Sequence, residues 1–426
     1  MRLSGPMRAK NGMCAKNGMR AKNGMRTKNG LVVIGRETPR EPPRETPYVK
    51  LLAMELGQGT KRPALRPASF DDYDEIAALE EANGLSSKSR EQWLHLWQNN
   101  PAYRQLPGWP IGWVLEDENG RIVGSLQNVP CLYRFDGRTY VGGFGRGWAV
   151  DVRYRAFSLL LIVRQLQQPN VDVRLTSTAS PKTTAVLTKQ GWLRVPAGEW
   201  DRSALWVTSY AQTVRRYLAT KTPSIVSGLA GPLLHLPLLV KDIISARPRR
   251  FKTNCELEWC TGFDGRFDQF WKELESQNSR VLLATRDRQT LEWHFKYALE
   301  QNRIWILTAC DGPRLLAYAI LERRDAQALD LTRMLLVDFQ ALANDQDLAS
   351  AMICRVLDRC RRDGIQVLEN IGCWLETVQP HIRRAPHRRD LGNWSYLYQA
   401  TNQGLADALK RPESWYPTQY DTDASL

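Results

Sequence analysis

The sequence lacks the spacing of cysteine and histidine that a structural zinc site requires. Its eight cysteines include no Cys-x-x-Cys pair, and none of its five histidines lies at ligand spacing from a cysteine. Cys354 and Cys360 fall in a helical pattern and Cys310 ends an apolar strand, which is typical of buried free thiols. We therefore expect no metal site, no disulfide and a reducing, cytoplasmic compartment.

A hydrophobic run long enough to cross a bilayer is also missing. The longest apolar stretch, residues 225–240, is interrupted by Pro232, His235 and Pro237, and it is shorter than the roughly 20 residues that a spanning helix needs. Because a basic cluster follows it, residues 225–250 are expected to form an interdomain helix or, as the alternative, to touch a membrane surface. No cleavable signal peptide is expected.

Carboxylates are scarce at the start of the chain and nearly balance the cations elsewhere. Residues 1–50 carry 12 Lys and Arg against three Glu, which places +9 of the formal net charge of +14 in this segment and +5 in the other 376 residues. The folded part therefore lacks the basic excess that nucleic-acid binding requires, and we expect no nucleic-acid partner.

The first 60 residues contain no pattern from which a core can be built. Residues 7–30 are four copies of a hexapeptide of the type Met-Arg-Ala-Lys-Asn-Gly, and a period of six with one apolar residue matches neither a helix nor a strand. We expect residues 1–60 to be a disordered, low-complexity tail. Our hypothesis is that the functional start is Met54.

From residue 61 onward the pattern predicts an α+β fold. Helices are expected from Ser69 to Asn83 and from Arg90 to Gln98, followed by antiparallel strands with turns at 119–120 and 136–137. The expected strands are 112–116, 121–129, 132–135, 139–144 and 147–152. Next come a helix at 158–167, a strand at 171–176 and a helix at 182–190, which predicts one parallel pair after the meander.

The junction between the last strand of the meander and its helix carries a recognisable motif. Residues 150–160 read Val-Asp-Val-Arg-Tyr-Arg-Ala-Phe-Ser-Leu-Leu, which resembles the acyl-CoA loop V-x-P-x-x-[RQ]-G-x-G-x-[GA] of the GCN5-related N-acetyltransferase family. Val150 and Arg155 match, Ala156 and Ser158 replace glycines, and Val152 and Leu160 depart from the pattern. The resemblance implies that backbone N–H groups at this helix N-terminus bind the diphosphate of an acyl-CoA. The implied cofactor-binding residues are Val150, Val152, Arg153, Arg155, Ala156, Phe157, Ser158, Leu159 and Leu160.

A second family-like segment follows at the expected spacing. Ser180 to Leu187 lead into Gly191-Trp192, which is similar to the family pattern N-x-x-A-x-x-x-Y-x-x-x-G-[FW]. Leu187 stands where the family often has the tyrosine that protonates the leaving thiolate. The resemblance therefore supplies no acid at this position.

The C-terminal half repeats the same order of elements. A helix at 285–295, strands at 304–309, 315–322 and 329–337, a helix at 348–361 and a strand at 366–371 are expected. Where a second phosphate loop would lie, residues 338–347 contain no glycine, no arginine and three aspartates, which repel a diphosphate. We expect two tandem acyl-CoA N-acyltransferase-like α+β domains, each a mixed, mainly antiparallel sheet flanked by helices. The first domain, with the acyl-CoA loop, is expected at 61–222, and the second, a degenerate copy, at 255–400. Residues 223–254 are expected to form a helical linker between them, and residues 401–426 to fold back to the cleft.

Candidates for catalysis come from three places in the chain. N-acyl transfer requires a base that deprotonates the amine, and His294 between two aromatic residues could line the cleft between the domains. Asp151 ends the loop strand, where it can act as a base or cap the turn. Asp421 and Asp423, in an unusually aromatic C-terminal segment, could hold a cationic amine or belong to a docked strand.

The resemblance implies an acyl-CoA-dependent N-acyltransferase, bacterial and cytoplasmic, with acetyl-CoA or another acyl-CoA as co-substrate. Tandem proteins of this kind suggest an amino sugar of a surface polysaccharide as the amine acceptor, by association alone. Two alternatives stay open: a non-catalytic binding module with a degenerate fold, and an aminoacyltransferase of the peptidoglycan type, whose long coiled-coil arm is not evident.

Overall fold

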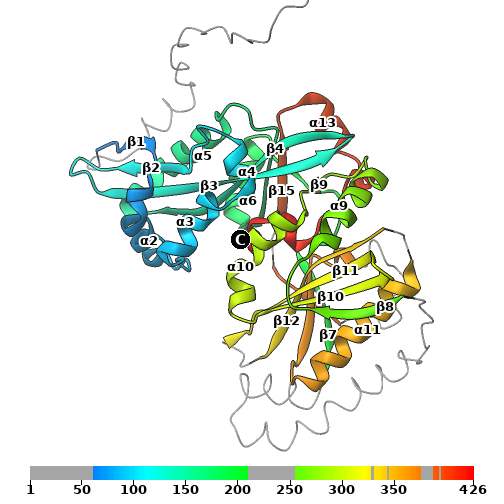
Figure 1. Ribbon diagram of the computed structural model, residues 1–426. Helices are drawn as coiled ribbons and strands as arrows, with labels where there is room; N and C mark the ends of the chain where they lie inside the picture. The colour runs from blue at the N-terminus through cyan, green and yellow to red at the C-terminus, as the bar shows by residue number, and fades with distance from the viewer. Residues whose placement is uncertain (1–60, 210–254, 328–330, 343–344, 376–386, 393–394) are drawn as a thin grey trace, which may run out of the picture. The chain divides into compact units, whose positions relative to one another are not determined.

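The computed structural model describes residues 61–209, 255–327, 331–342, 345–375, 387–392 and 395–426 (Figure 1). The predictions for the tail at 1–60, the start at Met54, the linker at 223–254 and the membrane contact at 225–250 lie outside these residues. Within them, no helix is long and apolar enough to cross a membrane.

The first sheet is built mainly from the N-terminal half and is antiparallel apart from one pair. Its order is β1-β2-β3-β4-β5-β15-β6, with β9 paired to β3 beside this path. A turn at Asp136 and Gly137, both with positive φ (49° and 69°), joins the long strands β3 and β4, as the Asp-Gly signal predicts. β4 and β5 are parallel. The strands are β1 (Ala64–Pro67), β2 (Gly112–Glu116), β3 (Ile122–Phe135), β4 (Arg138–Val150), β5 (Val173–Ala179), β6 (Leu193–Arg194), β9 (Leu283–Ala284) and β15 (Ser395–Ala400).

The second sheet repeats this plan. Its order is β14-β7-β13-β12-β11-β10-β8, and β12 and β13 form its parallel pair. Helix α11 connects these two strands, as α5 connects β4 to β5 in the first sheet. The strands are β7 (Arg202–Val207), β8 (Glu256–Cys260), β10 (Ile304–Asp311), β11 (Arg314–Arg323), β12 (Arg333–Ala341), β13 (Val367–Ile371) and β14 (His387–Asp390). Two mixed sheets flanked by helices confirm the predicted fold class.

Each sheet takes a strand from the other half of the chain. β7 leaves the N-terminal half and pairs with β13 of the second sheet, and β15 returns from the C-terminal half to pair with β5 of the first. β9 also crosses over to pair with β3. The boundaries predicted at 222 and 400 stay predictions, but these exchanged strands tie the two halves together through backbone hydrogen bonds.

Helices cover both faces of the first sheet. α5 and α6 pack on one face in a small apolar cluster with Trp113, Leu161 and Trp192, while α2, α3 and α4 contact β3 from the other face. The periodicity predicted α3 at its observed bounds, but it missed the amphipathic α9, which is capped by Asp264. The helices are α2 (Tyr73–Ala82), α3 (Arg90–Gln98), α4 (Pro101–Gln105), α5 (Ser158–Leu166), α6 (Pro181–Lys189), α9 (Gly265–Gln277), α10 (Arg288–Glu300), α11 (Gln346–Arg362) and α13 (Gln403–Ala408).

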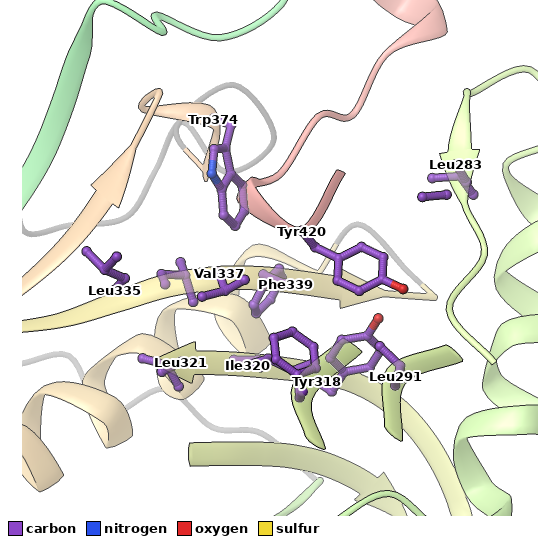
Figure 2. Packing of buried hydrophobic residues seen from close by; sticks show 14 of the residues in the cluster. Leu283, Leu291, Tyr318, Ile320, Leu321, Leu335, Val337, Phe339, Trp374 and Tyr420 are labelled. Carbon is purple, nitrogen blue, oxygen red and sulfur yellow. The ribbon is translucent and has the colours of Figure 1, made fainter. Parts of the chain in front are cut away.

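The main hydrophobic core is continuous between the two sheets. One cluster of buried residues contains Val129 and Phe144 of the first sheet together with Ile320 and Val337 of the second. Figure 2 shows this cluster around β11 and β12, where Tyr420 from the C-terminal segment joins the strand residues. Because buried apolar residues of both halves belong to one cluster, the two halves pack directly against each other.

Candidate functional site

The divergence of β4 from β5 opens a cavity in the first sheet. The two strands pair in register only from Gly142–Phe144 to Val173–Leu175. Beyond this point Gly145–Trp148 of β4 and residues of β5 such as Thr176 line a cavity of about 380 Å³, which we call the first cavity. This volume lies in the range that small-ligand sites occupy. A strand edge without a neighbouring strand also offers backbone groups to an extended ligand.

The walls of the first cavity contain hydrogen-bond donors that have no partner. Ile162 and Gln165 of α5 and Leu187 of α6 form part of the lining. Trp148 and Trp192 also line it, and the indole N–H of each is buried and unpaired among the described residues. Both nitrogen atoms are closed off from solvent, so Trp148 and Trp192 contribute to the wall of the cavity without presenting these N–H groups to a ligand.

A buried carboxylate faces the first cavity from α2. Glu80 is 2% exposed, and its Oε1 accepts hydrogen bonds from the amide of Gln127 and from Nη1 of Arg146, 3.4 Å away. Arg146 Nη1 also donates to Gln127 Oε1 at 2.8 Å. Burial raises the pKa of Glu80, although Arg146 and Gln127 oppose this shift. A carboxylate with a raised pKa in a cavity has the properties of a general base.

A glycine of β4, Gly147, lies against the carboxylate of Glu80. Gly147 has a φ of +61°, and a Cβ built on it would lie 2.0 Å from Glu80 Oε1. Glycine is therefore required here both by its backbone conformation and by the close approach of the carboxylate. A side chain at this position would displace the end of Glu80 from its place among Gln127 and Arg146.

The residues predicted to bind acyl-CoA lie next to the first cavity in sequence but do not line it. Val150 ends β4, residues 152–157 form a 3-10 helix (η2), and Ser158 begins α5. Val152 is 68% exposed, Arg153, Arg155 and Ala156 are exposed, and Phe157 is buried. Arg153 and Arg155 thus face solvent at the N-terminal end of the helix whose later turns, at Ile162 and Gln165, reach the cavity. The role of residues 150–160 stays a prediction.

Asp151 occupies the N-terminal cap of η2. Its Oδ1 accepts from the backbone N–H of Arg153 at 3.0 Å, and its Oδ2 pairs with the guanidinium groups of Arg153 and Arg121 at 3.1 and 2.9 Å. The hydrogen bond from Arg153 and the arginine charges lower the pKa of Asp151. The structure therefore places this carboxylate as a cap of the turn, outside the first cavity.

The two aspartates of the C-terminal segment have separate environments. Asp423 lines the first cavity, where its Oδ1 accepts from the backbone N–H and hydroxyl of Ser177 and its Oδ2 from the hydroxyl of Thr178. These bonds anchor the short helix η6 (Asp423–Ser425) to β5. Asp421 instead is buried against Arg286 at 2.8 Å, so a cation of the protein already neutralises it. Burial raises the pKa of Asp421 against the opposing effect of Arg286.

A second cavity adjoins the first, with Ser86 and Arg146 in both linings. It also measures about 380 Å³ and is lined from both halves of the chain, by α3 with its preceding loop and by α10 with the ends of β10 and β11. His294 of α10 lines this second cavity, and its Nε2 lies 3.0 Å from Ser425 Oγ. Its ring is 4.5 Å from that of Tyr420.

The protonation of His294 links the second cavity to the pH dependence of stability. Burial and the nearby charges of Arg324 and Lys88 lower the pKa of His294 to about 3. An unfolded histidine binds a proton near pH 6.5, so between these values the unfolded chain holds a proton that the folded chain does not. Stability is therefore full above about pH 6.5 and falls as the pH drops toward 3.

We expect His294→Asn to flatten this dependence. Urea unfolding at pH 7.5 and pH 5 should show that the variant loses about 1–2 kcal/mol less than the wild type between the two pH values. The same pair of measurements on the wild type is the reference. An unchanged loss in the variant would mean that His294 is protonated in the folded protein.

Sequence reasoning missed Glu80, Arg146 and Lys88. The signal for Glu80 was present, because a carboxylate falls on the same face of α2 as the buried Ile76 and Leu79. A charge at a core position of an amphipathic helix needs a partner or a function. Arg146 and Lys88 carry no comparable signal, since only the meeting of β4 with the loop before α3 brings them to the cavities.

Comparison with known proteins adds a likeness of architecture. No protein-family model matches the sequence, and a search of curated proteins finds no match. The structure is similar to a GCN5-related N-acetyltransferase from Anabaena variabilis (TM-score 0.48, 13% identity, 80% of this chain and 73% of that one). It is also similar to Saccharomyces cerevisiae N-myristoyltransferase with bound myristoyl-CoA (TM-score 0.49, 12% identity, 85% of this chain and 88% of that one). A third similar structure is a probable N-acyltransferase from Enterococcus faecalis (TM-score 0.49, 12% identity, 80% of this chain and 72% of that one). At these values the likeness says nothing about activity.

Proposed function

We propose that this chain is an acyl-CoA-dependent N-acyltransferase whose donor binds in the first cavity. The observation that supports this most directly is the divergence of a parallel strand pair over a cavity that also contains a buried carboxylate, Glu80. The motif at residues 150–160, which begins at the end of the same β4 strand, supports the same donor.

The first cavity fits the narrow arm of an acyl-CoA. The arm carries amide groups and a thioester, which can pair with the backbone groups of a strand edge. The unpaired edge of β4 beyond Phe144 supplies further backbone partners. In this proposal Arg153 and Arg155, which are exposed in η2 just before α5, bind the phosphates outside the cavity.

The proposed reaction needs a base, and Glu80 fits this role. In its ionised form Glu80 takes a proton from the ammonium group of the acceptor, and the neutral nitrogen attacks the thioester carbonyl. The carbon–sulfur bond then breaks, the acyl group stays on nitrogen, and the second nitrogen proton neutralises the leaving thiolate. Arg146 and Gln127 hold the Glu80 carboxylate in place throughout.

The acceptor in this proposal is a primary amine, and an amino sugar is the first class to be screened. It would enter from the second cavity, because this cavity meets the first at Arg146 beside Glu80. Burial lowers the pKa of His294 to about 3, so this ring adds no further positive charge to the second cavity at neutral pH.

Donor binding is tested by thermal unfolding with and without acetyl-CoA. Ligand at 100 times its dissociation constant adds about 2.7 kcal/mol to the free energy of unfolding, which raises the melting temperature. Thr176→Trp fills the first cavity and should abolish the increase, and Ala156→Glu should reduce it if the loop at 150–160 binds the phosphates.

The outcomes separate the proposal from its alternatives. An increase that Thr176→Trp removes places the donor between β4 and β5. If acetyl-CoA and longer acyl-CoAs leave the melting temperature of the wild type unchanged, the chain is a binding module without this chemistry.

A further inference from the structure

The charge lining of the second cavity is strongly one-sided. Its lining includes four cationic side chains, and the carboxylate among them is that of Glu322. The cations are Lys88, Arg146, Arg303 and Arg324. They come from the loop before α3, from β4, and from segments bordering β10 and β11, so the fold gathers them from both halves of the chain.

The carboxylate of Glu322 is already engaged at both oxygens. Glu322 is 3% exposed, its Oε1 lies 2.5 Å from Arg303 Nη1, and its Oε2 lies 2.7 Å from Arg324. It therefore bridges two guanidinium groups, and its single negative charge is shared between them. Lys88 has no ion-pair partner among the described residues, and Arg146 shares Glu80 with Gln127 at the border of the first cavity.

Lys88 lies in surroundings that disfavour its charged form. Burial, together with the charges of Arg146 and Arg324, lowers the pKa of Lys88 to about 8. A group of like charges in a half-enclosed cavity is unfavourable unless an anion is brought among them. Such an anion forms charge-assisted hydrogen bonds, which are among the stronger contacts available to a ligand.

We propose that the second cavity binds the acceptor through an anionic oxygen group, held by Lys88 and Arg324, while the amine of the same molecule faces Glu80. This inference rests on the proposed acyl transfer and names the class of acceptor: an amine that carries a carboxylate or a phosphate. The geometry supports it because Arg146 lies in both cavities and joins the two binding regions.

The first experiment measures the anion site without acyl transfer. Inorganic phosphate is titrated against the wild type, Lys88→Gln and Lys296→Gln, and the melting temperature is followed. Lys296 is the matched control, since it lies on α10, pairs with Glu91 and Glu300, and does not line the cavity. We expect the apparent dissociation constant to rise about 10-fold or more in Lys88→Gln and to stay unchanged in Lys296→Gln. Equal phosphate binding by all three proteins would overturn the proposal.

The second experiment compares three small amines as acceptors with acetyl-CoA: ethanolamine, glycine and phosphoethanolamine. They differ in whether the amine carries a hydroxyl, a carboxylate or a phosphate, so a higher kcat/KM for one anionic amine also identifies the anion. Lys88→Gln should remove this preference by raising KM for the anionic amine. A preference for ethanolamine would overturn the acceptor class while leaving acyl transfer in place. Phosphate binding without transfer to any amine would instead count against the proposed function.

Discussion

Replacement of Glu80 by glutamine is expected to slow acyl transfer by about 10²- to 10⁴-fold, because the amide keeps the shape of the side chain but cannot take a proton. The KM for acetyl-CoA should change little, since Glu80 acts on the acceptor amine. Steady-state release of free CoA thiol measures both constants. Burial raises the pKa of Glu80, so the wild-type rate should increase with pH around a midpoint above the ordinary carboxyl pKa of about 4.3. The variant should lose this increase of rate with pH.

Two further variants separate the chemistry of Glu80 from its packing. Asp74→Asn changes an exposed carboxylate on the same helix that lines neither cavity and should leave the rate unchanged. Gly147→Ala keeps the carboxylate but pushes it from its position, and a displacement of about 1 Å can cost about 100-fold in rate. A full rate in Glu80→Gln would remove this residue from the mechanism, and Asp423 would be the next carboxylate to test in the first cavity.

Arg286→Ala is expected to destabilise the fold by about 3–5 kcal/mol, because it leaves two buried carboxylates without their cation. Arg286 is 1% exposed and pairs with Asp338 at 2.9 Å and with Asp421 at 2.8 Å. Burial alone would lower the pKa of Arg286, but the two aspartates raise it overall. Its guanidinium also lies 4.6 Å from the centre of the Tyr420 ring, which attaches the C-terminal segment to the core. Urea unfolding followed by tryptophan fluorescence measures the loss.

The matched control for this prediction is Arg288→Ala, two residues further along. Arg288 is half exposed and pairs with Asp268 at 3.5 Å, so its loss should cost no more than about 1 kcal/mol. A combined replacement of Arg286, Asp338 and Asp421 by methionine and leucines should cost less than Arg286→Ala, because no charge is then left unpaired. Equal stability of Arg286→Ala and the wild type would mean that water reaches this cluster.

Much of the secondary structure could be read from local patterns. The local pattern predicted a helix at Arg90–Gln98, which are the bounds of α3, and the Asp-Gly pair predicted the turn between β3 and β4. Both signals act within a few residues, so no distant contact is needed to express them. The prediction failed where local signals were ambiguous. β3 and β4 were each expected as two shorter strands, because Pro130 and the glycines at 145 and 147 resemble turn residues.

The candidate site was predictable only in part. His294 lines the second cavity and Asp423 lines the first, and the roles of both residues stay predictions. Asp421 was proposed either to hold a cationic amine or to belong to a docked strand, and the structure pairs it with Arg286, a residue 135 positions away in the sequence. An ion pair between two distant residues leaves no local pattern, because neither residue type nor spacing identifies the partner.

The sequence by itself determined the order of the elements, the α+β class and the repetition of one plan in both halves, because hydrophobic periodicity and turn residues act locally. Only the tertiary structure decided the exchange of β7 and β15 between the sheets, since strand pairing depends on which edges meet in space. It also decided the two cavities, where β4 and β5 diverge and where Glu80, Arg146 and Lys88 come together. These features depend on long-range packing and on charges brought close by the fold, and neither is encoded in a short stretch of the chain.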